Sequence, residues 1–266
     1  HDWRAMTASR ASGSLSYCAR QAQAHDNDRF VCALFAPEQM RESLFAILAF
    51  NSEVARIRET VHEALLGEIR LQWWRETLDS IFAGQAPRHE VATALAAAVA
   101  RHGLPRAPFD RLIEGRVRDL YDEEPDTLSG LLAYVGETAE PLAELELVIL
   151  GATDAASLDA ARHVATAFAL TGLLRAIGHH ARQGRLYLPK DVMAQAGLAR
   201  RTVLELRRDP ALAKVALQIA GIARQHLAHA RGLRPQVSRR ALPALLPGLL
   251  AGVYLDRLAR AANDPL

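Results

Sequence analysis

The chain has 266 residues, of which 50% are hydrophobic and 23% charged, so it is long enough for one large helical domain or two small ones. The formal net charge is only +2, and no stripe of alternating basic and aromatic residues occurs, which excludes nucleic acid as a partner. The two cysteines, Cys18 and Cys32, form no disulfide framework and indicate a reducing compartment. Because no Ser-, Gly- or Pro-rich linker divides the chain, we expect a flexible N-terminal tail over residues 1–14 and a single domain over residues 15–266.

Hydrophobic residues recur at helical spacing along almost the whole chain, and strand-like alternation is scarce. The first predicted helix begins at Pro37 and ends near His62, and a second runs from about Glu63 to Phe82 before the stop at residues 84–87. The same spacing predicts further helices over residues 90–102, 108–121, 127–134, 138–150, 155–180, 190–197, 202–206, 210–232 and 239–262. The sequence therefore predicts an all-α protein, a single bundle of about ten helices.

The longest apolar stretch, residues 241–255, is interrupted by Pro243, Pro247, Gly248 and Gly252. This pattern favours a buried helix with a broken start over a membrane span, which needs about 20 continuous apolar residues. No secretory signal sequence is visible. We therefore expect a cytoplasmic protein whose contact with the inner membrane is at most peripheral.

Four stretches of the chain, in this order, form a pattern: residues 30–50, 72–78, 112–120 and 173–189. The fourth is the most specific, because it ends in Gly184, Arg185, Leu186, Tyr187, Leu188 and Pro189. Together the stretches resemble the squalene/phytoene synthase family, whose members share a Gly-Arg-x-Tyr-Leu-Pro element. The resemblance covers roughly residues 15–260 and implies an isoprenoid-synthase-type helical bundle around a central cavity.

In that family two allylic diphosphates are joined head to head, and two acidic motifs on facing helices hold Mg²⁺ against the diphosphate. Carboxylates at i and i+4 share one helix face, and Mg²⁺ prefers carboxylate and phosphate oxygens. The resemblance therefore implies Mg²⁺ as a cofactor only if the chain is catalytic.

The residues at the first acidic motif depart from the family pattern. The motif's positions contain Ala55, Arg56 and Glu59, so a single carboxylate remains. Positive charge on Arg56 and Arg58 would repel a divalent cation at the place where the family binds one.

The second acidic motif is equally degenerate, with Ala176 and His180 at its aspartate positions. Arg175 is the one residue of this motif that matches the family. No catalytic residue is therefore expected to be intact in either motif.

Residues 49–51, the pair Trp73 and Trp74, and residues 174–176 are similar to a divergent branch of the family, the phytoene-synthase-like mitochondrial complex I assembly factors and their bacterial relatives. This resemblance implies a non-catalytic protein that acts in respiratory complex I assembly with a complex I subunit or assembly factor as partner, or a scaffold that holds an isoprenoid or lipid. The alternative is an active head-to-head prenyltransferase that uses farnesyl or geranylgeranyl diphosphate and an atypical metal site.

Two groups of residues are candidates for such sites. Arg175, Arg185 and Tyr187 match the family and either bind a diphosphate or similar ligand, or form buried ion pairs that hold the turn at residues 184–189. Asp119, Asp122 and Glu123, spaced i, i+3, i+4, either hold one Mg²⁺ at the cavity mouth or form a polar helix end before Pro125.

The histidines also form two pairs, His179 with His180 and His226 with His229. The second pair lies on one predicted helix with no Cys or Asp nearby in the sequence, and no ligand spacing typical of zinc sites joins the two pairs. The sequence therefore does not favour a metal site at either pair.

Overall fold

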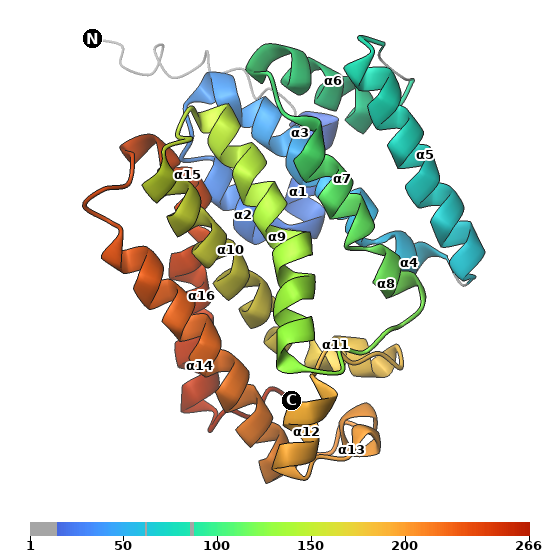
Figure 1. Ribbon diagram of the computed structural model, residues 1–266, viewed down its shortest axis with the longest axis vertical. Coiled ribbons are helices and arrows are strands. Elements are labelled where there is room, and N and C mark those ends of the chain that lie inside the picture. Colours follow the sequence, from blue (N-terminus) through green and yellow to red (C-terminus); the bar gives the residue numbers. More distant parts are fainter. Residues whose placement is uncertain (1–14, 62, 86–87) are drawn as a thin grey trace, which may run out of the picture.

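Two long helices, α9 (Leu128–Leu150) and α10 (Ala155–Arg175), pack side by side through the middle of the molecule (Figure 1). The computed structural model describes residues 15–61, 63–85 and 88–266, so the predicted tail 1–14 lies outside the described residues. The turn between the two helices follows from local sequence. Gly151 ends α9 in the left-handed conformation (φ 65°), and the Asp154 side chain caps α10 by accepting from the Ser157 N–H at 2.9 Å.

The other helices surround this pair, and no strand occurs among the described residues. They are α1 (Tyr17–His25), α2 (Asn27–Ala33), α3 (Glu38–Ala55), α4 (Ile57–Thr60), α5 (Ala64–Phe82), α6 (Glu90–His102), α7 (Arg106–Glu114), α8 (Val117–Leu120), α11 (Ile177–Arg182), α12 (Lys190–Ala196), α13 (Arg200–Leu204), α14 (Pro210–Gly232), the 3₁₀ helix η2 (Arg239–Ala241), α15 (Leu242–Leu245) and α16 (Pro247–Arg260). The prediction of a single all-α domain is confirmed.

The core has two parts, one at each end of the central pair. Helices α3 and α7 pack on α9, and α1 and α6 pack on α3, around fully buried side chains such as Phe50 and Phe109. Helices α14 and α16 pack on α10, and α12 packs on α14, around Val215 and Ala251. Small residues along α10 and α14 allow these two helices to lie close together, and they share the most extensive helix–helix contact in the described structure.

Several predicted helix boundaries differ from the structure. Predicted helices 127–134 and 138–150 are one helix, α9, which continues through Pro141, and this prediction was wrong. Residues on both sides of the proline are buried, so tertiary packing outweighs the missing backbone hydrogen bond. In the opposite sense, the predicted helices 37–62, 108–121 and 155–180 each break into two. The sequence did not predict α1 and α2, and His62, 86 and 87 lie outside the described residues.

One segment, Arg239–Arg260, is long and apolar enough to cross a membrane by length and composition, with a mean hydropathy of 1.3. In the fold it forms η2, α15 and α16, and 39% of its most apolar window is buried. Ala251 and Leu255 pack against the core, whereas Leu249 and Val253 are exposed. The broken start predicted from Pro243 and Pro247 is therefore confirmed.

A buried ionic group links α2 to the central helices. Asp26 caps α2 and binds the Arg29 guanidinium at 2.9 Å, and the same guanidinium lies 4.6 Å from the centre of the Phe168 ring. Glu146 of α9 is buried beside it. Burial raises the pKa of Glu146 to about 7, although the charge of Arg29 opposes this shift.

This raised pKa predicts a pH dependence of stability. Between its ordinary value of 4.5 and about 7, the folded state holds a proton that the unfolded state has released, so the free energy of unfolding falls as pH rises through this window. We expect Glu146→Gln to abolish that part of the slope and to be more stable relative to wild type at pH 8 than at pH 5. Urea denaturation at both pH values measures it. Glu137→Gln, on the exposed face of the same helix, is the control, and an unchanged slope in Glu146→Gln would contradict the assignment.

Candidate functional site

The two degenerate motifs lie at two helix breaks that face one another. Ala55 ends α3 and Arg56 stands between α3 and α4, while Ala176 stands between α10 and α11. The Glu59 carboxylate of α4 lies 3.9 Å from His179 Nε2 of α11. The fold therefore brings the two motif regions together, as the resemblance implies.

The arginines of the first motif region are bound to protein groups. Arg56 donates to Glu59 at 3.3 Å and contacts the His25 ring nitrogens at 2.7 and 3.0 Å. Burial and the charge of Arg56 lower the pKa of His25, so this ring is neutral and accepts. The one remaining carboxylate of the motif, Glu59, is thus adjacent to a guanidinium.

Asp122 lies between two arginines. Arg58 donates to both of its oxygens, from Nε at 3.1 Å and from Nη2 at 2.7 Å. Arg185 Nε lies 3.0 Å from Oδ1, close enough for an ion pair. Its N–H does not point at that oxygen, however, so this buried nitrogen has no hydrogen-bond partner among the described residues. Arg185 Nη2 donates to the Arg58 carbonyl at 3.3 Å and ties the turn at residues 184–189 to α4.

Asp119 is the buried carboxylate of the site, with 6% of its surface exposed. It accepts from Tyr187 Oη at 2.9 Å, from Tyr134 Oη at 3.0 and 3.1 Å, and from Arg116 Nη1 at 3.2 Å. The two tyrosine rings stack at 5.5 Å, and Arg116 also donates to Tyr134 Oη at 2.9 Å. Burial, together with the Asp119 charge, raises the pKa of both phenols, so they stay protonated and donate.

His180 borders a small internal space beside this carboxylate. With Leu174, Leu186 and Tyr187 among others, it lines a cavity of about 10 Å³. That volume holds roughly one water molecule. Burial, and then the charges of His179 and Arg185, lower the pKa of His180 to about 4, so the ring is neutral at pH 7. At this point the interior is filled by side chains.

Arg175 has different neighbours from Arg185 and Tyr187. Its guanidinium lies 3.6 Å from the centre of the Tyr254 ring and 3.3 Å from an Asp28 oxygen. Tyr254 Oη donates to the same carboxylate at 3.0 Å. Arg175 borders a groove of about 380 Å³ between α10 and α16, so the three candidate ligand residues do not form one site.

The candidate carboxylates do not fit Mg²⁺. Two tyrosines and an arginine use Asp119, two arginines flank Asp122, and Glu123 is exposed on the same loop. A divalent cation at this point would face three guanidinium groups at short range, which Coulomb repulsion opposes. The arrangement matches the alternative interpretation of Arg185 and Tyr187, namely polar contacts that hold the turn.

Sequence reasoning missed Arg116 and Tyr134. The i, i+3 spacing of Arg116 and Asp119 is a helix-face signal, but Tyr134 is fifteen residues further along, in an apolar helix, and only the fold joins them. It also missed a carboxylate beside the second histidine pair: Asp159 of α10 lies 2.9 Å from His229 Nε2.

The class of protein is defined by three features together: the helical bundle, its two facing helix breaks, and the turn at residues 184–189 that tyrosine and arginine contacts hold. The squalene/phytoene synthase family model matches residues 22–266, and the chain belongs to this family. Over 94% of both chains the fold is similar to that of squalene synthase HpnC from Alicyclobacillus acidocaldarius, with a TM-score of 0.83 and 25% identity.

Among curated relatives, the chain is similar to NADH dehydrogenase (ubiquinone) complex I, assembly factor 6, of Bos taurus. The two are 32% identical over 254 residues, which is 96% of this chain and 76% of the relative. The human protein of the same name is 31% identical over the same shares. Chloroplastic phytoene synthase 1 of Arabidopsis thaliana is 30% identical over 70% of this chain and 47% of its own length.

The buried position of Asp119 predicts a structural effect of its removal. Asp119→Ala leaves the guanidinium of Arg116 buried without its carboxylate, and we expect it to lower the free energy of unfolding by about 3–5 kcal/mol. Chemical denaturation measures the change. Glu123→Ala, four residues further on and exposed, is the control and should change stability by no more than about 0.5 kcal/mol. Equal stability of the two variants would show that Asp119 has no such role.

Proposed function

We propose that this chain is a non-catalytic member of the squalene/phytoene synthase family that binds a protein partner during assembly of respiratory complex I. The observation that carries the proposal is the placement of Asp122 between Arg58 and Arg185. Guanidinium groups and internal ion pairs take the place where a family enzyme needs carboxylates free to hold Mg²⁺. The narrow space beside His180 supports the same proposal, because a prenyl chain has no room there.

A partner surface is available on α5. Leu65, Ile69 and Trp73 are spaced i, i+4, i+8 and share one face of the helix, with 64%, 57% and 41% of their surface exposed. Leu66, beside them, is 48% exposed. We call these four residues the α5 stripe. Contiguous exposed apolar surface of this kind is typical of interaction sites, and aromatic anchors are common among interface hot spots.

The names of the relatives support the choice of partner. Proteins named as complex I assembly factor 6 align with this chain over 96% of its length. A complex I subunit or assembly intermediate is therefore the partner that we propose for the α5 stripe.

A second candidate function is binding of an isoprenoid or lipid. It is favoured by the groove between α10 and α16, where the Arg175 guanidinium lies beside Leu174, Leu258 and other apolar side chains. Such a site suits a molecule with an anionic head and an apolar tail, since arginine binds phosphate oxygens and leucines bind hydrocarbon.

The non-catalytic proposal predicts the outcome of a direct assay. Incubation of the purified protein with farnesyl or geranylgeranyl diphosphate should release diphosphate only at the background rate, with or without Mg²⁺. A squalene synthase assayed in parallel is the positive control. Release that depends on Mg²⁺ would overturn the proposal and support the prenyltransferase alternative.

The α5 stripe predicts a separable loss of binding. We expect the double variant Leu65→Ser/Ile69→Ser to reduce capture of complex I subunits from respiratory membranes by at least about tenfold, since buried anchors at interfaces contribute about 2 kcal/mol or more. Quantitative mass spectrometry of the captured material measures it. The matched control is Leu249→Ser/Val253→Ser on α16, which removes equally exposed apolar residues from another face. Equal capture by both variants would exclude the α5 stripe as the docking surface.

A further inference from the structure

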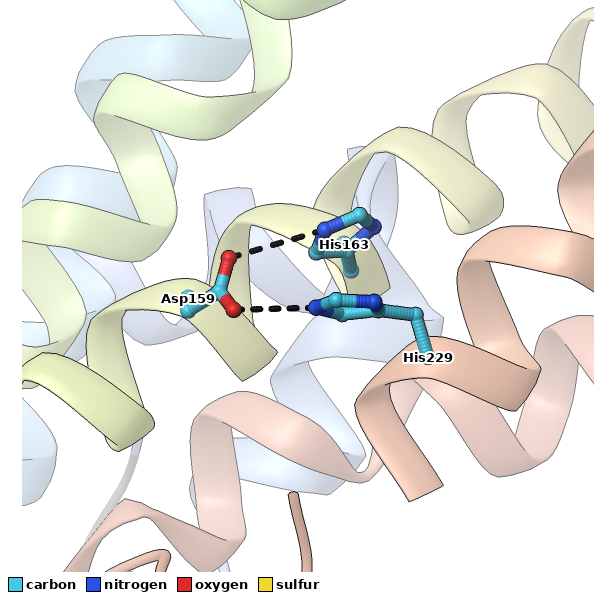
Figure 2. Close-up of side chains that lie close together, drawn as sticks. All are labelled: Asp159, His163 and His229. Atoms are coloured by element: carbon cyan, nitrogen blue, oxygen red, sulfur yellow. Dashed lines mark hydrogen bonds and ion pairs between the residues drawn. The ribbon is translucent and has the colours of Figure 1, made fainter. Parts of the chain in front are cut away.

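Helices α10 and α14 bring four ligand-type side chains together, none of which belongs to the site described above. Figure 2 shows three of them, Asp159, His163 and His229. Asp159 and His163 are spaced i, i+4 on α10, and His226 and His229 are spaced i, i+3 on α14. Each pair therefore lies on one face of its helix, and the two helices pack against each other. Metal sites of helical bundles are built in this way, from side chains on facing helices.

Three of these side chains direct their ligand atoms at one point. His229 Nε2 lies 2.9 Å from Asp159 Oδ2, and His163 Nε2 lies 3.5 Å from Oδ1 of the same carboxylate. The two imidazole rings stack at 3.9 Å, and Figure 2 shows both pointing toward the carboxylate. All three ligand atoms lie within 4.8 Å of one another, the one such group among the described residues. Ligands at about 2.0–2.2 Å from a tetrahedral ion are separated by roughly 3.4 Å, so small side-chain rotations suffice.

His226 supplies the contact that orients a metal-binding histidine. Its Nδ1 lies 2.8 Å from His163 Nδ1, so one of the two nitrogens donates to the other. When His163 donates as the neutral Nδ1–H tautomer, the lone pair of its Nε2 faces the Asp159 oxygen at 3.5 Å, an arrangement that a metal ion bound between the two atoms makes favourable. Hydrogen bonding of the second ring nitrogen is the usual way in which proteins fix the tautomer of a metal ligand.

Charge and access also fit a cation. Asp159 and His229 are 48% and 49% exposed at their side chains, which gives an ion a route from solvent. The neighbouring Arg162 is held by Glu144 at 3.0 Å, a carboxylate that Arg111 also binds. Two neutral imidazoles and one carboxylate suit Zn²⁺ and similar ions, whereas Mg²⁺ and Ca²⁺ prefer all-oxygen ligands.

We propose that Asp159, His163 and His229 bind one divalent transition-metal ion of the zinc class, with His226 as a positioning residue that orients His163. Three protein ligands leave a fourth position for water or an added ligand. The site is on the side of the molecule formed by α10 and α14 and is independent of the proposed complex I role.

The test is a metal titration of the full chain. Calorimetry measures the binding of Zn²⁺, and visible absorption measures the binding of Co²⁺. We expect one equivalent to bind and Mg²⁺ to compete poorly. His229→Ala and Asp159→Asn, both at half-exposed positions that tolerate substitution, should each weaken Zn²⁺ binding by at least about tenfold. His226→Gln should weaken it by about tenfold to a hundredfold without changing the stoichiometry, because it touches only the second nitrogen of His163.

His179→Ala is the matched control, since His179 is an exposed histidine of α11 outside the cluster. It should bind Zn²⁺ as the wild type does. Absence of binding, or binding that His229→Ala and Asp159→Asn leave unchanged, would overturn the proposal. An adventitious ion only would also overturn the proposal. It would show as several weakly bound equivalents that His179→Ala loses as readily as His229→Ala and Asp159→Asn do.

Discussion

A buried carboxylate has to be compensated, and in this fold the compensation of Asp119 joins three segments that are distant in sequence. Arg116 comes from the break before α8, Tyr134 from α9, and Tyr187 from the turn after α11. Tyr187 donates to Oδ1, Arg116 to Oδ2 and Tyr134 to both oxygens of this buried carboxylate. Because an unpaired charge in such a place costs several kcal/mol, the positions of α8, α9 and the turn depend on one another. Helix α9 contributes side chains to both core clusters and so joins them.

The same requirement accounts for the arginines around it. A family enzyme balances its acidic motifs with bound metal ions. Here the charges balance internally: Arg58 and Arg185 around Asp122, Arg56 with Glu59, and Arg175 with Asp28. The pairs Arg56–Glu59 and Arg175–Asp28 are exposed, so each contributes little to the free energy of unfolding. The Arg185 side chain is mostly buried and contacts both Asp122 and the Arg58 carbonyl.

Hydrophobic periodicity and helix-end residues predicted that helices flank the site, because an amphipathic helix is a local feature, but they did not predict that the helices expected over residues 37–62, 108–121 and 155–180 break there. They failed where tertiary burial decided the outcome, as at Pro141, where α9 continues because its residues on both sides of the proline are buried. The sequence predicted which residue types would take part in the site, but not which residues they would contact. Tyr187 and Arg185 were singled out, yet their partners Tyr134 and Asp122 come from other elements. Likewise His229 lacks a carboxylate in its own helix and gains Asp159 only when α10 packs on α14.

The Gly184–Pro189 element shows why sequence resemblance in this family is a weaker guide to catalysis than to fold. Tyr187 donates to a buried carboxylate, and Arg185 ties the turn to α4 by donating to a backbone carbonyl and pairing with Asp122. These contacts stabilise the bundle whether or not a metal ion is bound. The Gly184–Pro189 element therefore keeps its structural role when the acidic motifs are lost. A chain can therefore retain the most specific motif of an enzyme family through its structural role alone. The residues with which a family enzyme holds Mg²⁺ are the carboxylates at the two helix breaks, and of the positions Ala55, Arg56, Glu59, Ala176 and His180 in this chain only Glu59 carries one.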